Sequence, residues 1–220
     1  MLLHHFVKME AHPVCGLDTR AVIFDAFGTL YGLQSKRRPF AKLAHACPKS
    51  RQVLEAAMTR PMDLLDVAEE FAPTSIDLGS LQADLRLELE SIRLFPDALH
   101  VLKKLCEAGI KIGIASNLAK PYSESLLDLL PVHAECAWSF DVGFLKPDSR
   151  IFSAICAKID VPPSEAVMVG DTFSTDYLGA MAFGMRAVLL ARTGASYLTV
   201  PTIKTLGELM DLRGLSLRVR

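Results

Sequence analysis

Short runs of apolar and β-branched residues alternate with segments of helical periodicity through most of this chain. The apolar runs predict strands at residues 21–24, 110–115, 137–140, 166–169 and 187–191. The helical patterns predict helices at 97–108, 121–130, 149–159, 174–183 and 205–212. Strands that alternate with helices build parallel sheets, because each parallel connection needs a crossover. The sequence therefore predicts an α/β fold with a doubly wound, Rossmann-like parallel sheet.

Residues 35–92 interrupt this alternation. They contain no convincing strand pattern, and helical candidates follow one another at 39–47, 50–58, 62–71 and 78–92. In the last of these Leu81, Leu85 and Leu89 recur every four residues and share one helix face. We therefore expect a small α-helical cap domain (residues 35–92) inserted after the first strand of a core domain (residues 18–34 and 93–220). The two connections would lie near Gly32 and Leu94.

The composition narrows the class of protein. The chain has 220 residues, half of them hydrophobic, and a net charge of −1, so nothing in its bulk charge favours nucleic acid or a membrane surface as partner. Its five cysteines are scattered without a CxxC pair, which is typical of free thiols in a reducing compartment. The first eleven residues are too short and polar for a secretory signal. We expect a cytoplasmic protein with a small-molecule substrate, and no pattern indicates an oligomeric state.

Polar residues follow the first two predicted strands of the core, at the edge where open α/β sheets bind ligands. Asp25 comes directly after the first strand, and Gly28 and Thr29 follow it on what reads as a tight turn. A carboxylate nucleophile with backbone N–H groups and a hydroxyl beside it suits attack on an electrophile. Ser116 and Asn117 end the next strand and offer a hydroxyl and an amide that can hold a phosphoryl or carboxylate oxygen.

A cation and a pair of acids complete the pattern. Lys146 lies in a loop and can balance the charge of a carboxylate nucleophile. Asp171 follows a further strand, and Asp176 comes five positions later at the start of a predicted helix. Two carboxylates that converge without a cation repel each other, whereas a divalent metal ion removes that repulsion. These residues therefore indicate a metal site.

The chain thus has four polar segments, which lie at Asp25–Thr29, at Ser116 and Asn117, at Lys146, and at Asp171 with Asp176. In this order they resemble the four motifs of the haloacid dehalogenase-like (HAD) hydrolase superfamily. The resemblance extends from about residue 21 to residue 212, and the insertion falls where that family carries its helical C1 cap. It implies that Asp25 is the nucleophile, that Thr29 and Ser116 contact the transferred group, and that Lys146 steadies it. Gly28, Asn117 and Phe27 would also border the substrate.

The resemblance also implies a Mg²⁺ cofactor. The ion would lie between Asp25, the backbone carbonyl of Phe27 and Asp171, and Asp176 would support Lys146 or the water shell of the metal. Because the family ligand at the Phe27 position is a carbonyl oxygen, the side chain found there does not affect metal binding.

The first motif departs from the phosphatase pattern, which is D-x-D with the second Asp acting as general acid and base. Here that position is Phe27, whose ring cannot carry a proton. A positioned general acid is typically worth about 10²–10⁴ in rate. The sequence from Asp25 to Leu30 is instead similar to the D-x-[YF]-G-T-L of the L-2-haloacid dehalogenases, which need neither a leaving-group acid nor a metal.

The fourth motif favours the other branch. The dehalogenases generally replace its Gly-Asp with Ser and Asn types, whereas this chain keeps Gly170 and Asp171. Without a metal, Asp171 would place a negative charge beside both Asp25 and an anionic haloacid. The sequence therefore predicts a Mg²⁺-dependent phosphohydrolase of a small anionic metabolite. The alternatives are a metal-independent dehalogenase with an ester on Asp25 and a catalytically weak HAD scaffold with a binding role.

Overall fold

The computed structural model describes residues 19–193 and 200–211 of the chain. The two outer limits of the predicted core domain, residues 18 and 220, lie outside the described residues, and so do the first eleven residues. Position 212, where the last predicted helix ends, also lies outside them. Within the described part of the chain no helix is long and apolar enough to cross a membrane.

A parallel sheet of six strands forms the centre of the fold, in the order β5-β4-β1-β6-β7-β8. The strands are β1 (Ala21–Phe24), β4 (Lys111–Ser116), β5 (Glu135–Trp138), β6 (Ala166–Gly170), β7 (Arg186–Leu190) and β8 (Thr202–Ile203). The chain first winds outward from β1 in one direction, through β4 and β5, and later returns to the other side of β1 through β6. This is the predicted doubly wound α/β fold, and the reversal of direction makes the ends of β1, β4 and β6 a natural ligand site.

Helices cover both faces of this sheet because its strands are apolar on both sides. Val22 and Phe24 of β1 face one core cluster, and Ala21 and Ile23 face the other. The first cluster includes residues of α5 (Pro96–Glu107), α6 (Pro121–Asp128) and the 3-10 helix η3 (Leu206–Asp211). The second includes residues of α8 (Ser149–Ile159) and α9 (Leu178–Ala182). The alternation of side chains along each strand thus fixes which helix packs on which face.

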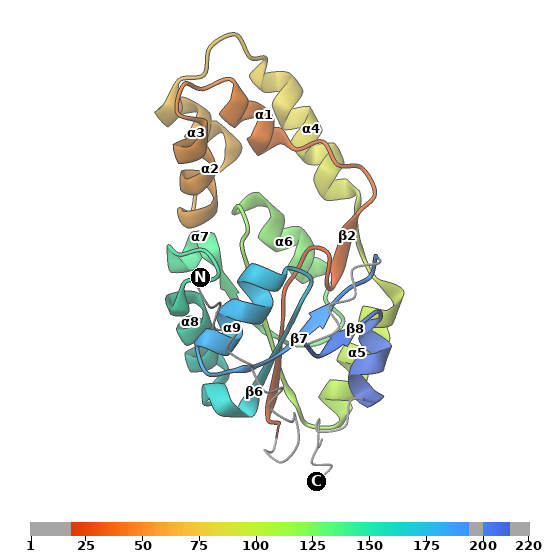
Figure 1. Cartoon of the computed structure of the whole chain (residues 1–220). Coiled ribbons are helices and arrows are strands. Elements are labelled where there is room, and N and C mark those ends of the chain that lie inside the picture. Colours follow the sequence, from red (N-terminus) through yellow and green to blue (C-terminus); the bar gives the residue numbers. More distant parts are fainter. Residues whose placement is uncertain (1–18, 194–199, 212–220) are drawn as a thin grey trace, which may run out of the picture.

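Four helices lie beyond the edge of the sheet (Figure 1): α1 (Pro39–His45), α2 (Ser50–Thr59), α3 (Leu64–Phe71) and α4 (Leu78–Glu90). They occupy the segment in which the sequence predicts only helices, and their bounds agree with the prediction to within three residues. The chain enters this unit through β2 (Tyr31–Leu33) and leaves it through β3 (Ile92–Leu94), which pair in an antiparallel ribbon. The ribbon contains Gly32 and Leu94, the positions near which the connections are predicted.

Some elements differ from the sequence prediction. Strand β5 ends at Trp138, not at residue 140, because the chain turns into the short helix α7 (Ser139–Val142). The Oγ of Ser139 accepts the N–H of Leu118 at 2.8 Å and donates to the carbonyl of Met58 at 2.6 Å, which holds this turn in place. A 3-10 turn, η1 (Pro163–Glu165), precedes β6.

The helix predicted at 174–183 begins as a π-helical turn, η2 (Phe173–Tyr177), before it continues as α9. The helix predicted at 205–212 is the 3-10 helix η3. These last differences are of helix type and not of position. The π turn includes Asp176, so the irregularity lies at one of the predicted site residues.

Candidate active site

Asp25 lies directly after β1, at the carboxyl edge of the sheet. Its N–H donates to the carbonyl of Val169 on β6 at 2.9 Å, which continues the strand pairing by one residue. The side chain is buried, and its Oδ1 accepts two hydrogen bonds, from the Oγ of Ser116 at 3.1 Å and from the Nζ of Lys146 at 2.7 Å. Among the described residues no donor is bonded to Oδ2 of Asp25. The carboxylate is therefore held by one oxygen and offers the other.

Lys146 lies between two carboxylates. Its Nζ is 2.7 Å from Oδ1 of Asp25 and 2.7 Å from Oδ1 of Asp176, and its side chain is 2% exposed. Asn117 fixes the backbone of this residue, because its Oδ1 accepts the N–H of Lys146 at 2.7 Å and its Nδ2 donates to the carbonyl at 3.1 Å. Both ends of the Asn117 side chain are thus used to place Lys146. The predicted contact of Asn117 with an anionic group stays a prediction.

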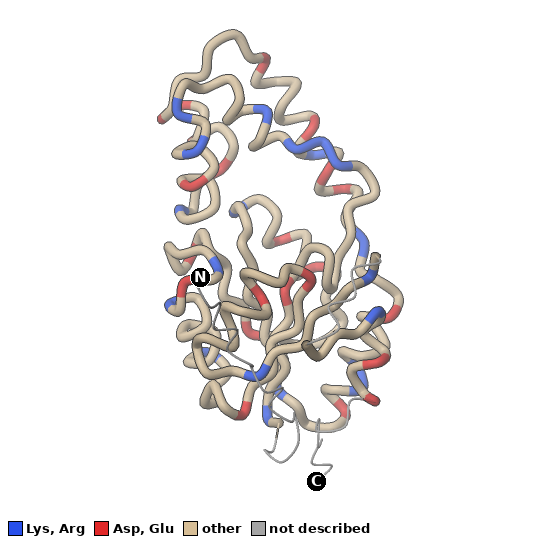
Figure 2. Tube along the Cα trace, viewed as in Figure 1, with Lys and Arg blue, Asp and Glu red and all other residues tan. Residues whose placement is uncertain are grey.

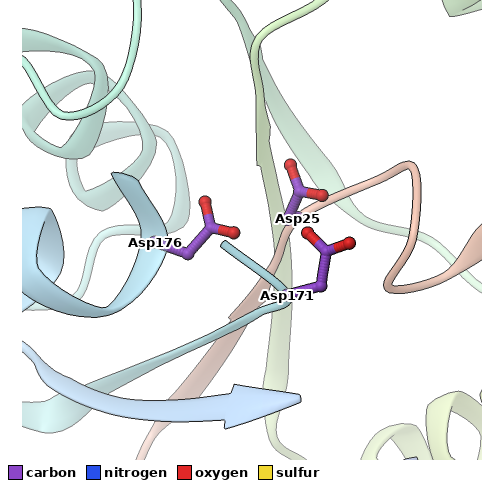
Figure 3. A group of neighbouring side chains, drawn as sticks. All are labelled: Asp25, Asp171 and Asp176. Atoms are coloured by element: carbon purple, nitrogen blue, oxygen red, sulfur yellow. The ribbon is translucent and has the colours of Figure 1, made fainter. Parts of the chain in front are cut away.

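Asp171 joins Asp25 and Asp176 in a group whose carboxylate oxygens all lie within 4.8 Å of one another, a spacing that can hold a metal ion. Figure 3 shows the three carboxylates converging from the end of β1, the end of β6 and the turn before α9. The two oxygens of Asp176 are already engaged, one by Lys146 and the other by the N–H of Thr172 at 3.0 Å. Among the described residues, no Lys or Arg nitrogen forms an ion pair with Asp171.

Burial and charge shift the pKa values of these groups in a consistent way. Burial raises the pKa of Asp25 to about 6 against the opposing effect of Lys146, and the charge of Asp176 adds to the rise. Loss of hydration around its carboxylate and the charge of Asp176 also raise the pKa of Asp171, although that residue is exposed as a whole. Burial alone would lower the pKa of Lys146, but Asp25 and Asp176 outweigh it, so its pKa is raised. The site thus contains one cation and three crowded acids.

Most carbonyls of the turn after Asp25 accept hydrogen bonds, either within the turn or from other parts of the chain. The carbonyl of Ala26 accepts the N–H groups of Thr29, Leu30 and Tyr31, and that of Leu30 accepts the N–H of Phe95 at 2.9 Å. The carbonyls of Gly28 and Thr29 accept hydrogen bonds from the guanidinium group of Arg192. Among the described residues, no hydrogen bond reaches the carbonyl of Phe27. Backbone carbonyls in folded proteins are almost always paired, so this oxygen is available to a ligand.

Gly28 is required at this turn for two separate reasons. Its φ is +89°, in the region that favours glycine, and a Cβ at this position would lie 2.0 Å from Oδ2 of Asp171. Thr29 follows, fully buried, and its Oγ1 has no hydrogen-bond partner among the described residues. Buried hydroxyls without a partner are rare, so this one is available to a group bound at the site.

The ring of Phe27 points toward the helices beyond the sheet edge. It packs edge-on against Tyr122 of α6, with ring centroids 5.7 Å apart, and Tyr122 also lies beside Phe40 of α1 at 6.3 Å. The Tyr122 hydroxyl donates to Oε1 of Glu88 on α4 at 2.7 Å. Phe27 thus takes part in an aromatic contact between the sheet edge and the α1–α4 unit.

Two charged residues near the site were not identified from sequence. Arg192 lies two residues after the end of β7, at the same edge of the sheet, and it donates hydrogen bonds to the carbonyls of Gly28 and Thr29. The available signal was an arginine two residues after the buried apolar strand β7. Glu88 carried none, because a glutamate in a polar helix is usually solvated. Its carboxylate is buried, and it accepts the backbone N–H groups of Arg37 and Arg38, which lie in the basic stretch between β2 and α1 (Figure 2).

Comparison with known proteins assigns the chain to a family. The model of the haloacid dehalogenase-like hydrolases matches residues 19–184, which include all of the site described above except Arg192. The chain belongs to the haloacid dehalogenase-like hydrolase family, as its four motifs predicted. The fold and the enzyme class expected from the sequence are confirmed.

Relatives with assigned activities fall in both branches of the family. The chain is 35% identical over 139 residues to a ribulose-1,5-bisphosphate 5-phosphatase of Halopiger xanaduensis, a match that covers 56% of this chain and spans 58% of that protein. It is 30% identical to a glyceraldehyde 3-phosphate phosphatase of Methanopyrus kandleri, over 79% of this chain and 84% of the relative. It is also 28% identical to (S)-2-haloacid dehalogenase 1 of a Pseudomonas species, over 91% and 97% of the two chains.

Solved structures support the fold. A HAD phosphatase from Thermococcus onnurineus superposes with a TM-score of 0.63 at 24% identity, and the match covers 92% of this chain and all of that one. At this level of identity the similarity concerns the architecture alone.

Proposed function

We propose that this chain is a Mg²⁺-dependent phosphohydrolase that acts on a small anionic metabolite through a phosphoryl group carried by Asp25. One observation supports this proposal most strongly. The oxygens of Asp25, Asp171 and Asp176 lie within 4.8 Å of one another, whereas only Lys146 provides a positive charge between them in the described part of the chain. Such an excess of negative charge fits a hard divalent cation.

The donors present are suited to that ion. Hard oxygen ligands, as Mg²⁺ prefers, are present in the carboxylate of Asp171 and in Oδ2 of Asp25 and the carbonyl of Phe27, which no donor of the described residues reaches. Asp176 would act beside them by holding Lys146. When bound, the ion would supply positive charge next to the phosphoryl oxygens and would favour the ionised forms of Asp25 and Asp171.

The residues of the chain divide the reaction into two steps. In the first, a carboxylate oxygen of Asp25 bonds to phosphorus, the bond between phosphorus and the ester oxygen breaks, and the leaving group departs with its electron pair. In the second, a water molecule attacks phosphorus, and phosphate leaves with Asp25 restored as a carboxylate. Lys146 keeps Asp25 in place through its 2.7 Å contact, and Ser116 and Thr29 provide hydroxyls beside the transferred group.

Phe27 limits the choice of substrate. Since its ring cannot protonate a leaving group, the first step suits esters and anhydrides whose leaving groups are already acidic, such as acyl or aryl phosphates. Otherwise the proton must come from water or from the substrate. We therefore propose that this enzyme prefers substrates with good leaving groups over simple alkyl phosphates.

We further propose that residues 35–92 act as a cap domain over this edge of the sheet, on a core of residues 18–34 and 93–220. Among the described residues, side-chain contacts between the unit and the sheet domain include Tyr122 with Glu88, Ser139 with the carbonyl of Met58, and Lys120 with Asp63 at 3.2 Å. A cover of this kind excludes water while the phosphoryl group is transferred.

The proposal is tested with a panel of acyl phosphates, aryl phosphates, sugar phosphates and 2-chloropropionate. Wild type and Asp25→Asn are compared with Mg²⁺ and in EDTA. Phosphate release that needs both Asp25 and Mg²⁺ is the expected result. Equal and negligible turnover by both proteins would instead favour a binding role for the scaffold.

A metal-independent dehalogenase is the second candidate, and Phe27 is the observation that favours it. In that reaction Asp25 displaces halide from carbon, no leaving-group acid is needed, and water then hydrolyses the ester. Chloride release from 2-chloropropionate that persists in EDTA and disappears in Asp25→Asn would select this candidate over the phosphohydrolase.

A further inference from the structure

Arg192 contacts the turn that carries the candidate nucleophile. It follows β7 at the carboxyl edge of the sheet, and its side chain is 21% exposed. Its Nε donates to the carbonyl of Gly28 at 3.2 Å, and its Nη2 donates to the carbonyl of Thr29 at 2.8 Å. Two successive carbonyls of the 25–31 turn are therefore held by one guanidinium group, 164 and 163 positions away in sequence.

The guanidinium is itself fixed on its other edge. Asp97, in the first turn of α5, accepts Nη1 at 2.8 Å and Nη2 at 3.0 Å, and its Oδ2 also accepts the N–H of Leu206 at 2.9 Å. Burial would raise the pKa of Asp97, but these hydrogen bonds lower it overall, so the carboxylate stays charged. The ring of Phe95 lies 4.1 Å below the guanidinium carbon. Such a bidentate and stacked arrangement leaves the group little freedom.

The position of this turn matters for the distance between two site residues. Gly28 approaches Asp171 so closely that a Cβ would lie 2.0 Å from its Oδ2, so a small movement of the turn changes how Asp171 faces Asp25. Phe95 also donates its N–H to the carbonyl of Leu30, at the connection that leaves the α1–α4 unit. Arg192 thus joins the turn, the connection and the start of α5.

We propose that Arg192 is a positioning residue for the transfer step, which rests on the proposed function of the same site. By holding the carbonyls of Gly28 and Thr29, it keeps Asp25 and Asp171 in the arrangement that the reaction needs. A lysine cannot replace it, because one ammonium group cannot reach two carbonyls and both oxygens of Asp97 from one fixed plane.

The experiment compares Arg192→Lys with Arg60→Lys. Arg60 forms an equally bidentate pair with Glu70, at 2.7 and 2.6 Å, but it contacts neither the turn nor the sheet edge, so it is a matched control. We expect Arg192→Lys to lower kcat about 10- to 100-fold with KM within about threefold of wild type, as for a misplaced reacting group. Arg60→Lys should leave both constants unchanged. Equal kcat values in wild type and Arg192→Lys would overturn the proposal.

A second variant and a second readout keep the test decisive. Asp97→Asn retains the guanidinium but weakens its anchor, so it should give a smaller loss of kcat than Arg192→Lys. If Arg192→Lys does not fold, Asp97→Asn takes its place in the test. Amide hydrogen exchange of Thr29, Leu30 and Tyr31 should speed up in both variants and not in Arg60→Lys. If wild type has no turnover that depends on Asp25, the proposed function fails, and exchange alone then decides whether Arg192 holds the turn. Unchanged exchange would overturn it.

Discussion

A Cβ atom at Gly28 would lie 2.0 Å from Oδ2 of Asp171, so the turn after β1 and the end of β6 approach as closely as a glycine allows. The residue also has a φ of +89°. Any side chain at this position must therefore displace either the turn or the carboxylate. The two segments are thereby coupled, although 143 positions separate them in the chain.

The first prediction follows from this contact. Gly28→Ala should lower turnover by about 100-fold or more and weaken Mg²⁺ binding, because it moves Asp171 relative to Asp25. Gly184→Ala is the control, since Gly184 has a φ of +91° but none of the described residues has an atom within 4 Å of its Cβ position. Both variants should lose about 1 kcal/mol of stability from backbone strain. Isothermal titration with Mg²⁺ separates them, and equal affinities in the two would contradict the prediction.

The regular part of the fold was predictable because its signals are local. The buried run Ala21–Phe24 and the helix Ser149–Ile159 have the predicted bounds, since each is defined by its own apolar pattern and its flanking residues. Strands β2, β3 and β8 were missed because two or three residues are too few to display an alternation. Their pairing depends on residues distant in sequence.

Which residues meet at the sheet edge was easier to predict from the sequence than which contacts they make. Strand ends indicated Asp25, Ser116 and Asp171, and the parallel sheet places strand ends together. The pattern could not indicate that Asn117 uses both ends of its side chain on the backbone of Lys146. Such contacts arise only when two loops meet in the folded chain.

The second prediction concerns the buried cation. Lys146→Met removes the positive charge between Asp25 and Asp176 and leaves two buried acids facing each other. In EDTA this should cost about 3–5 kcal/mol of unfolding free energy. The double variant with Asp176→Asn should recover part of that loss, because one of the two charges is gone. Urea denaturation measures both, and additive losses would show that the three groups do not act as a unit.

The third prediction is a pH dependence that opposes the usual one for acids. Burial raises the pKa of Asp25 from 3.8 to about 6, so between these two pH values the folded chain holds a proton that the unfolded chain has lost. The contribution of Asp25 to the free energy of unfolding should therefore increase as the pH falls. Relative to Asp25→Asn, which cannot titrate, wild type in EDTA should gain on the order of 1 kcal/mol between pH 7 and pH 5.

Mg²⁺ provides the control for this measurement. A bound cation favours the ionised carboxylate and lowers its pKa, so the gain should shrink when Mg²⁺ is saturating. A difference between wild type and Asp25→Asn that stays constant from pH 7 to pH 5 in EDTA would contradict the assigned shift.

The fourth prediction concerns the contact between α6 and α4. Tyr122→Phe removes the hydroxyl that donates to the buried carboxylate of Glu88, at a cost of about 2 kcal/mol for a bond to a charged group. Hydrogen exchange should speed up in α4 and at Arg37 and Arg38, because the Glu88 carboxylate joins them. Tyr31→Phe is the matched control, since its hydroxyl bonds the carbonyl of Leu126 on the same helix and does not touch α4. The same exchange pattern in both variants would rule out a specific contact.

The fifth prediction addresses the missing general acid. Phe27→Asp places a carboxyl group where phosphatases of the family carry one. It should raise turnover of alkyl phosphates by up to about 10²–10⁴-fold, because an alkoxide needs a proton to leave. The aryl ester p-nitrophenyl phosphate should gain far less, since its leaving group departs without one. Phe27→Asn loses the same packing against Tyr122 but cannot donate as an acid, so it isolates the proton effect. Equal changes for both substrates would mean that this position does not govern proton transfer in the chain.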